Sequence, residues 1–225
     1  LTDSLVHLSL VQDNRDGWYE IHPLLRRYFR DKLEASPHAE PAKRRYCGIM
    51  AKKSAEMPYN PTVEIVEEFK PFLLHLQTSV GEYPQYIADE DLFWSYTGLA
   101  SYYNGQGLYA IAEPYCQACL TATRTHLGDN HPHVAASLNN LALLYQSQGR
   151  YTEAEPLYLE ALDLRKQLLG DNHPDVASSL NNLALLYYSQ GRYTEAEPLY
   201  LEALDLYKRL LGDNHPHVAT SLNNL

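Results

Sequence analysis

The residues of this chain whose types and spacing are best suited to chemistry are the histidines of a recurring hexapeptide. The sequence LGDNHP begins at Leu127, Leu169 and Leu211, so successive copies lie 42 residues apart. Each copy joins an aspartate, an asparagine and a histidine, which are candidate metal ligands, to a glycine turn of the kind that surrounds phosphates. Either kind of site requires several of these side chains to converge on one ligand.

The elements that must position these histidines exclude that convergence. Gly128 is suited to ending one helix and Pro132 to beginning the next, and His131, as the residue before a proline, is expected to be extended. Neighbouring helices pack about 8–10 Å apart, whereas a zinc ligand lies about 2 Å from its metal. Histidines of successive copies therefore cannot share an ion. We interpret LGDNHP as a linker between helices and predict no metal site.

Two cysteines have the CxxC spacing of redox and zinc sites. Cys116 and Cys119 are not accompanied by a second pair, and the 42-residue register places them at the positions of Tyr158 and Ala161, which are apolar packing positions. We therefore predict two buried thiols that pack as small hydrophobic groups. The sequence also lacks a GxxxxGK[ST] loop and any other catalytic spacing, which predicts a protein that is not an enzyme and needs no cofactor.

The repeat around this hexapeptide covers more than half of the chain. Residues 127–168 and 169–210 are identical apart from five pairs of positions. A degenerate copy, Leu99–Leu120, precedes them in the same 42-residue register, and self-similarity at a fixed period is the signature of a solenoid. The five differing pairs are His133/Asp175, Ala136/Ser178, Gln146/Tyr188, Arg165/Tyr207 and Gln167/Arg209.

Each copy has the hydrophobic spacing of two helices separated by a glycine. Thr152 and Glu155 have the spacing of a capping box, and Pro156 predicts a loosened start of the second helix rather than a break. The apolar residues at helical spacing in the first complete copy are Val134, Leu138, Leu141, Ala142 and Tyr145, then Ala154, Leu157, Tyr158, Ala161, Leu162 and Leu168. The predicted helix pairs are 91–104 with 108–124, 133–147 with 151–168, and 175–189 with 193–210.

These spacings resemble the tetratricopeptide repeat, and the 42-residue length with the wording LNNLALLY…GRYTEAEPLYLEAL is similar to the kinesin-light-chain subtype. The matching positions are Leu138, Leu141, Ala142, Tyr145, Ala154, Tyr158 and Ala161. The resemblance implies an all-α fold, a right-handed α-solenoid of helix hairpins. It also implies a concave groove, lined by the first helix of each repeat, that takes a protein or peptide.

A polar arc on the first helices is the candidate binding surface. Three of the five differing positions (133, 136 and 146) lie on the arc of helix 133–147 that faces away from its apolar stripe. An asparagine amide both donates and accepts, so a row of asparagines could hold an extended backbone of any sequence. We expect these asparagines to face solvent when no ligand is bound. The alternative to a binding surface is a solvent-exposed surface whose sequence varies without functional constraint. The predicted peptide-binding residues are Trp94, Asn139, Asn140, Gln146, Asn181, Asn182, Tyr188, Asn223 and Asn224.

The segment before the repeats has a different pattern. Ser9–Gln12 and Trp18–Ile21 are strand-like runs around the turn DNRDG, which predicts a β-hairpin, and Pro23 opens a helix. This order resembles the end of the winged-helix subdomain of STAND (NB-ARC, NLR-like) signalling NTPases, whose junction histidine senses the β-phosphate of bound ADP. The resemblance implies that His22 would sense ADP or ATP in a full-length parent protein. The alternative for His22 is a helix cap or a surface histidine.

The predicted organisation has three parts. Residues 1–36 are the winged-helix remnant, 37–88 a helical linker, and 89–225 the repeat array, with repeats at 89–126, 127–168, 169–210 and a partial copy at 211–225. The resemblances imply a non-catalytic sensor and regulatory segment of a STAND NTPase, whose partner is a protein or peptide, or its own NTPase domain. The alternative function is a purely structural scaffold that docks subunits.

Composition limits the remaining partners and the location. The net charge of −10 disfavours nucleic acid, which requires a positive surface. No apolar run approaches the roughly 20 residues of a membrane-spanning helix. Three cysteines without a disulfide pattern favour the cytoplasm, and because the chain opens on Leu1 we expect a piece of a longer protein.

Overall fold

The computed structural model describes residues 11–13, 19–21 and 23–225, which divide into two compact units, 1–46 and 47–225. In the first unit, β1 (Val11–Asp13) pairs antiparallel with β2 (Tyr19–Ile21), with Val11 opposite Ile21. Helix α2 (Pro23–Glu34) follows. Lys43, in the first half of α3 (Ala39–Ala55), donates a hydrogen bond of 2.6 Å to Glu34. A two-stranded ladder of this length does not define a winged helix, and His22 lies outside the described residues.

The second unit begins within α3 and carries five short elements before the array. Of these elements, α5 and η3 contact α6, the first helix of the array. The compact unit therefore begins at Cys47, inside the expected linker, rather than at residue 89. The elements are α4 (Val63–Phe69), the 3-10 turn η1 (Lys70–Phe72), α5 (Leu73–Glu82) and the 3-10 turns η2 (Pro84–Tyr86) and η3 (Asp89–Asp91).

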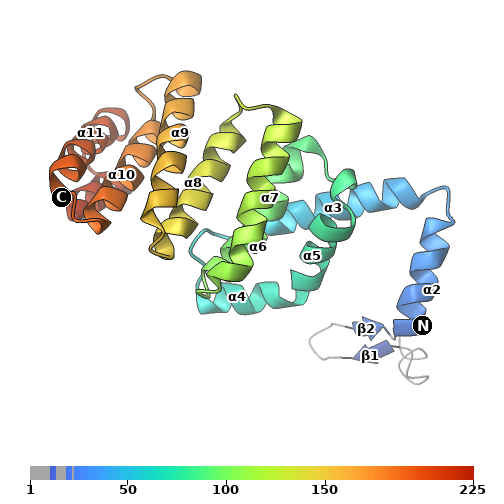
Figure 1. Cartoon of the computed structure of the whole chain (residues 1–225). Coiled ribbons are helices and arrows are strands. Elements are labelled where there is room, and N and C mark those ends of the chain that lie inside the picture. Colours follow the sequence, from blue (N-terminus) through green and yellow to red (C-terminus); the bar gives the residue numbers. More distant parts are fainter. Residues whose placement is uncertain (1–10, 14–18, 22) are drawn as a thin grey trace. The chain divides into compact units, whose positions relative to one another are not determined.

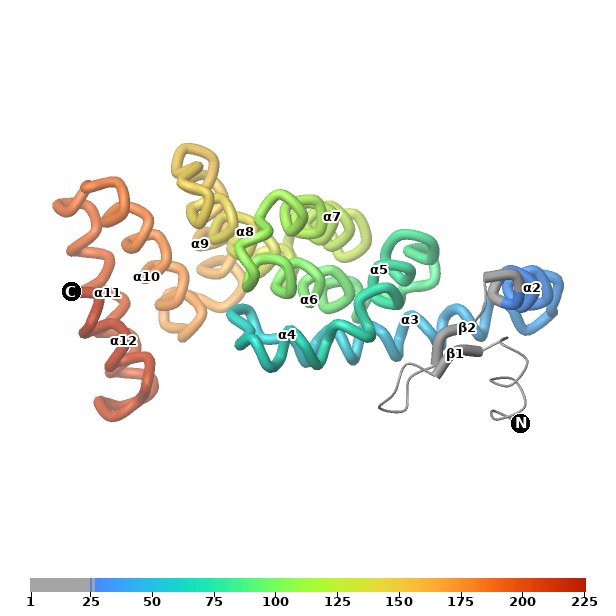
Figure 2. The backbone as a smooth tube through the Cα atoms, turned by 90° about the horizontal axis from the view of Figure 1, so that it is seen from below, coloured from blue at the N-terminus to red at the C-terminus, as the bar shows by residue number. Residues whose placement is uncertain are grey.

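The array is a succession of antiparallel helix pairs, as the repeat predicts (Figure 1). All three predicted pairs are confirmed, with boundaries that differ from the expected ones by at most a few residues. They are α6 (Leu92–Asn104) with α7 (Tyr109–Leu127), α8 (Pro132–Ser147) with α9 (Tyr151–Leu169) and α10 (Pro174–Ser189) with α11 (Tyr193–Leu211), followed by α12 (Pro216–Asn224). Viewed from below, α6 lies on the side of α3 and α4, and α7 lies on the opposite side (Figure 2).

The core follows the apolar stripes of the two helices in each pair. Leu138 and Ala142 of α8 are 0% exposed, and so are Ala154, Tyr158 and Ala161 of α9. The alanines let the two helix backbones approach closely, while the larger side chains fill the remaining space. The predicted core positions of the repeat are therefore confirmed except for two on α9: Leu157 is half-buried, and Leu168 is 37% exposed.

Glycines lie both in the turns within a helix pair and in the turns between successive pairs. Gly149 between α8 and α9 has φ +73° and Gly128 between α7 and α8 has φ +80°, a conformation that favours glycine because other residues carry a Cβ. Among the described residues no helix is both long and apolar enough to cross a bilayer.

The predicted capping box at the start of α9 is wrong. The residue at the cap is Arg150, without a side-chain capping bond, and Thr152 is already inside the helix. The Arg150 guanidinium donates instead to Glu153 in its own helix and to Glu113 of the preceding repeat, each at 2.7 Å. Pro156 is the sixth residue of α9 and does not interrupt the helix, as expected.

Candidate functional site

The recurring histidines cap the first helix of each repeat. His131 is extended, with φ −127° and ψ 142°, and its Nδ1 accepts a hydrogen bond of 3.1 Å from the backbone N–H of His133. His173 and His215 accept the equivalent bonds at 3.1 and 3.2 Å. The interpretation of LGDNHP as a linker is confirmed. The capping role was missed, although a polar residue directly before a proline at the first helical position was the available signal.

This cap can be tested at His173, in the middle of the array. His173→Ala is expected to lower the free energy of unfolding by about 0.5–2 kcal/mol, because one backbone N–H at the start of α10 loses its acceptor. His173→Asn is the matched control, since an asparagine oxygen can accept the same bond. Urea unfolding of both variants measures the difference, and equal losses would show that the ring serves packing rather than capping.

The predicted binding residues all lie on α6, α8, α10 and α12, the first helices of the repeats. Trp94 and Tyr188 are 41% and 53% exposed, and Asn223 is also exposed. Asn139 is buried, at 8%. The remaining residues of the predicted set are half-buried: Asn140, Gln146, Asn181, Asn182 and Asn224.

The expectation that the asparagines simply face solvent is wrong. Asn182 Nδ2 donates to Asn139 Oδ1 at 2.9 Å, and Asn224 Nδ2 donates to Asn181 Oδ1 at 3.0 Å. These bonds join α8 to α10 and α10 to α12, so they tie successive repeats together. Each pair uses one oxygen and one nitrogen. The oxygens of the second asparagines, Asn182 and Asn224, take no part in these bonds and belong to half-buried side chains, so they remain for another partner, whereas Asn139 is buried.

Several differences between the near-identical repeats are explained by packing rather than by binding. Ser178 and Tyr207 share a hydrogen bond of 2.7 Å between their hydroxyl groups, and both differ from the preceding copy. Arg165, at the position of Tyr207, donates instead to the backbone oxygen of Asp175 and to Ser179, at 3.0 and 2.8 Å. The clustering of differences on one arc is therefore not by itself a sign of partner specificity.

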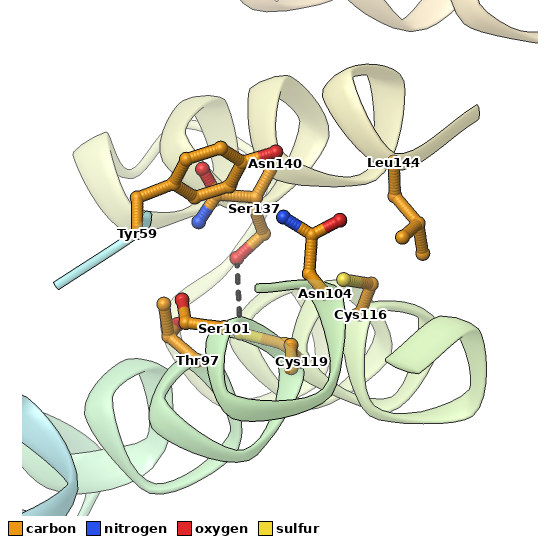
Figure 3. Close-up of a pocket in the computed structure, with 10 residues that line it drawn as sticks. Tyr59, Thr97, Ser101, Asn104, Cys116, Cys119, Ser137, Asn140 and Leu144 are labelled. Carbon is orange, nitrogen blue, oxygen red and sulfur yellow. Dashed lines mark hydrogen bonds between the residues drawn. The ribbon is translucent and has the colours of Figure 1, made fainter. Parts of the chain in front are cut away.

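The second half of α6, beyond the exposed Trp94, lies against the end of α3 and the segment that follows it. A Cβ on Gly98 would lie 2.1 Å from Ser54 Oγ, and a Cβ on Gly105 would lie 2.4 Å from Pro61 Cγ. Tyr59, in the same segment, lines a small pocket between α6, α7 and α8, and Figure 3 shows its ring beside Asn140. Sequence reasoning treated this segment as a connection only. The available signal was glycine at 98 and 105, where the next copies have asparagine and serine.

The two cysteines of the CxxC motif are buried and free, which confirms the prediction of two packed thiols. Burial raises the pKa of the Cys116 thiol to about 12, and Cys119 and Glu113 nearby act in the same direction. Cys119 is within 3.3 Å of Ser137 Oγ, and this hydrogen bond partly opposes the effect of burial on its raised pKa. A protonated, enclosed thiol is a poor nucleophile, so the motif is structural.

Comparison with known proteins identifies the family. A family model of the tetratricopeptide repeat matches residues 91–167, 133–208 and 175–225, which together span more than half of the chain. The chain belongs to the tetratricopeptide repeat family. Tetratricopeptide repeats imply a protein-interaction or scaffold role for this array. No curated protein gives a significant match over its sequence.

Several solved structures share the fold. BtubC (BKLC) from P. vanneervenii is 22% identical with a TM-score of 0.58, over 83% of this chain and 82% of that chain. A putative kinesin light chain from Podosopora anserina with nearly identical TPR-like repeats is 23% identical with a TM-score of 0.58, over 72% of this chain and 81% of that chain. A second structure of that protein is 22% identical with a TM-score of 0.59, covering 72% and 80%. At this level of identity these likenesses show a shared fold.

The matched repeats begin at residue 91, so the family match does not extend to the first 90 residues of this tetratricopeptide repeat protein. No comparison supports the predicted winged-helix remnant, and its role in nucleotide sensing is not shown.

Proposed function

We propose that the repeat array is a non-catalytic module that binds an extended segment of a protein partner along α8, α10 and α12. The observation that carries this proposal is the pairing of asparagines between repeats. Each pair leaves the carbonyl oxygen of its second, half-buried asparagine as an acceptor for a peptide backbone, at an interval set by the repeat. A spacing of about 10 Å between repeats corresponds to roughly three residues of extended chain.

Two exposed aromatic residues would supply the side-chain contacts. Tyr188 is 53% exposed and packs edge-on against Tyr193 at 5.2 Å, so the ring is supported from one side and open on the other. Trp94 is supported in the same way by Phe93 at 5.0 Å. Exposed aromatic side chains with restrained rings are common anchors in protein interfaces, because they bury a large apolar area at a low entropic cost.

Peptide selection against the purified chain tests this proposal. Peptides recovered from a random display library are expected to bind the wild-type chain and to lose about tenfold or more in affinity to Tyr188→Ala. Glu202→Gln, an exposed change on the outer helix α11, is the matched control and should leave the affinity unchanged. If no peptide is recovered, or if every peptide is insensitive to Tyr188→Ala, the scaffold alternative is favoured over a peptide groove.

The asparagine pairs also have a folding role that can be measured separately. Asn139→Ala is expected to lower the free energy of unfolding by about 1 kcal/mol, because Asn182 loses its acceptor. Asn223→Ala removes an exposed amide of the same type and is the control. Thermal melting compares the two. A melting point of the Asn139 variant equal to that of the control would mean that the pair does not stabilise the array.

We further propose, on the order Ile21-His22-Pro23 alone, that the array regulates a STAND-type NTPase in a longer parent protein. His22→Ala in that protein is expected to weaken retention of ADP and to raise basal signalling. Unchanged ADP occupancy together with unchanged activity would leave the array as a binding module without a nucleotide switch.

A further inference from the structure

The first repeat departs from the later copies at three positions that face the same space. In the 42-residue register, Gly98 stands for Asn140, Gly105 for Ser147 and Cys116 for Tyr158, and each change removes side-chain volume. The two glycines are in close contact with Ser54 and Pro61. A Cβ added at Gly98 would lie 2.1 Å from Ser54, and one added at Gly105 would lie 2.4 Å from Pro61. Ser54 at the end of α3 and Pro61 before α4 therefore occupy the volume that larger side chains would fill at these glycines.

The complete repeat shows what normally occupies this position. Tyr158 is 0% exposed, and its hydroxyl donates to Gln146 Oε1 at 2.7 Å. The register equivalent of Gln146 in the first repeat is Asn104, but Cys116 stands where its tyrosine partner would be. The first repeat thus retains the amide and lacks the phenol.

Tyr59 supplies a phenol at that place from outside the repeat. Burial raises the pKa of Tyr59, nearby Cys116 and Tyr109 raise it further, and the Asn104 amide acts in the opposite direction. Tyr59 lines the same pocket as Asn140 and Leu144 of α8, so its ring lies next to the following repeat as well. Pro58 and Pro61 flank the Tyr-Asn pair and favour an extended backbone at the residues before them.

The walls around Tyr59 combine apolar and hydrogen-bonding groups in the way a phenol requires. Leu144 and Cys116 give apolar contact, and Figure 3 shows the Asn104 amide between them and the ring of Tyr59. Asn104 Oδ1 is buried and has no hydrogen-bond partner, so the pocket contains an acceptor that could take a hydrogen bond from a phenol hydroxyl. A small hollow remains beside the ring, bounded by these residues.

We propose that the first repeat contains a tyrosine-binding slot, formed by Thr97, Ser101, Asn104, Cys116, Asn140 and Leu144, which Tyr59 fills in place of the missing repeat tyrosine. The slot takes a tyrosine side chain from an extended segment, and it accepts one from a separate peptide when the ring of Tyr59 is removed. The slot lies between α6, α7 and α8. This inference does not depend on peptide binding along α8, α10 and α12, because the natural occupant of the slot belongs to the chain itself.

Chemical complementation is the first test. Tyr59→Ala is expected to lower the melting temperature by roughly 5 °C, and p-cresol is expected to restore part of this loss in the variant and none in the wild-type chain. Toluene, which lacks the hydroxyl, should restore less. The hexapeptide MPYNPT, residues 57–62, should bind the variant saturably, whereas MPANPT should not. A variant that melts like the wild-type chain, or that responds equally to p-cresol and toluene, would overturn the proposal.

A second test restores the tyrosine of the later repeats at position 116. Its expected effect on stability has opposite signs with and without Tyr59. Cys116→Tyr restores the residue of the later repeats, so in the wild-type background two tyrosines compete for the slot and stability should fall. In the Tyr59→Ala background the same substitution should raise the melting temperature. This comparison remains informative if Tyr59→Ala alone folds poorly, because the double variant is then expected to recover the fold. Equal effects of Cys116→Tyr in the two backgrounds would show that Tyr59 and the missing repeat tyrosine do not share a site.

Thiol reactivity supplies a readout that does not depend on stability. Cys116 lines the slot and is 6% exposed with Tyr59 present. Labelling by a thiol reagent, located by mass spectrometry, is expected to be at least tenfold faster at Cys116 in Tyr59→Ala than in Tyr59→Phe, which keeps the ring. Cys47, which is buried elsewhere, should react at the same rate in both variants. Equal labelling of Cys116 in the two variants would show that the ring of Tyr59 does not close the slot.

Discussion

Tyr158→Ala is expected to lower the free energy of unfolding by about 3–5 kcal/mol, the range observed when a large buried aromatic side chain is truncated. Tyr158 is 0% exposed and lies between α8 and α9, so its removal leaves a cavity that the packed helices cannot fill by a small shift. It also leaves Gln146 Oε1 without the donor that it has in the wild-type chain. Both losses act on the folded state.

The matched control for this change is Tyr193→Ala, the same substitution at a ring that is 59% exposed. Urea unfolding followed by circular dichroism compares the two variants. Because each repeat contacts mainly its neighbours, the variant is expected to unfold in a broader transition, with the damaged repeat opening first. A loss of less than about 1 kcal/mol for Tyr158→Ala would contradict the structural role assigned to this ring.

Gly98→Ala is expected to destabilise the chain by about 1–3 kcal/mol or more, although alanine is the better helix former. The added Cβ would lie 2.1, 2.5 and 2.9 Å from three atoms of Ser54, of which two belong to the backbone. Backbone atoms cannot rotate away as the end of a flexible side chain can. The clash is therefore relieved only if the end of α3 moves away from α6.

Gly81→Ala in α5 is the control, because a Cβ there meets no atom within 4 Å. That substitution is expected to be neutral or to stabilise by up to about 1 kcal/mol, through the lower backbone entropy of alanine in the unfolded chain. Hydrogen exchange of the α3 amides gives the decisive comparison. Faster exchange in α3 for Gly98→Ala alone is expected, and equal exchange in both variants would mean that α3 does not depend on contact with α6.

The helices of the array could be predicted from the sequence because their determinants are local. The apolar spacing of Leu138, Leu141 and Ala142 fixes which side of α8 is buried, and Gly149 ends the helix wherever its neighbours lie. Because the next copy has nearly the same sequence, it supports each assignment independently. Buried thiols at 116 and 119 followed from the same register, because the later copies have packing residues there.

The contacts between repeats and the use of the groove could not be predicted in this way. The bond between Asn139 and Asn182 depends on the rotation of one repeat relative to the next, which the pattern of a single helix does not contain. The same holds for Arg165, which donates to α10, while Tyr207 at the equivalent position bonds Ser178. Residues separated by a whole repeat become neighbours only when the array is assembled.

The placement of Tyr59 is the clearest case of a feature that only the tertiary structure decides. The segment 56–62 has no periodicity and no counterpart in the later copies, so its sequence predicts a connection and nothing about what it contacts. The sequence does contain the complementary half of the information: Gly98, Gly105 and Cys116 show that the first repeat has lost side-chain volume on one side. Volume removed from one element can be filled by any segment that reaches it. Only the contacts of Ser54 and Pro61 with α6 in the folded chain determine that Tyr59 is the residue that does so.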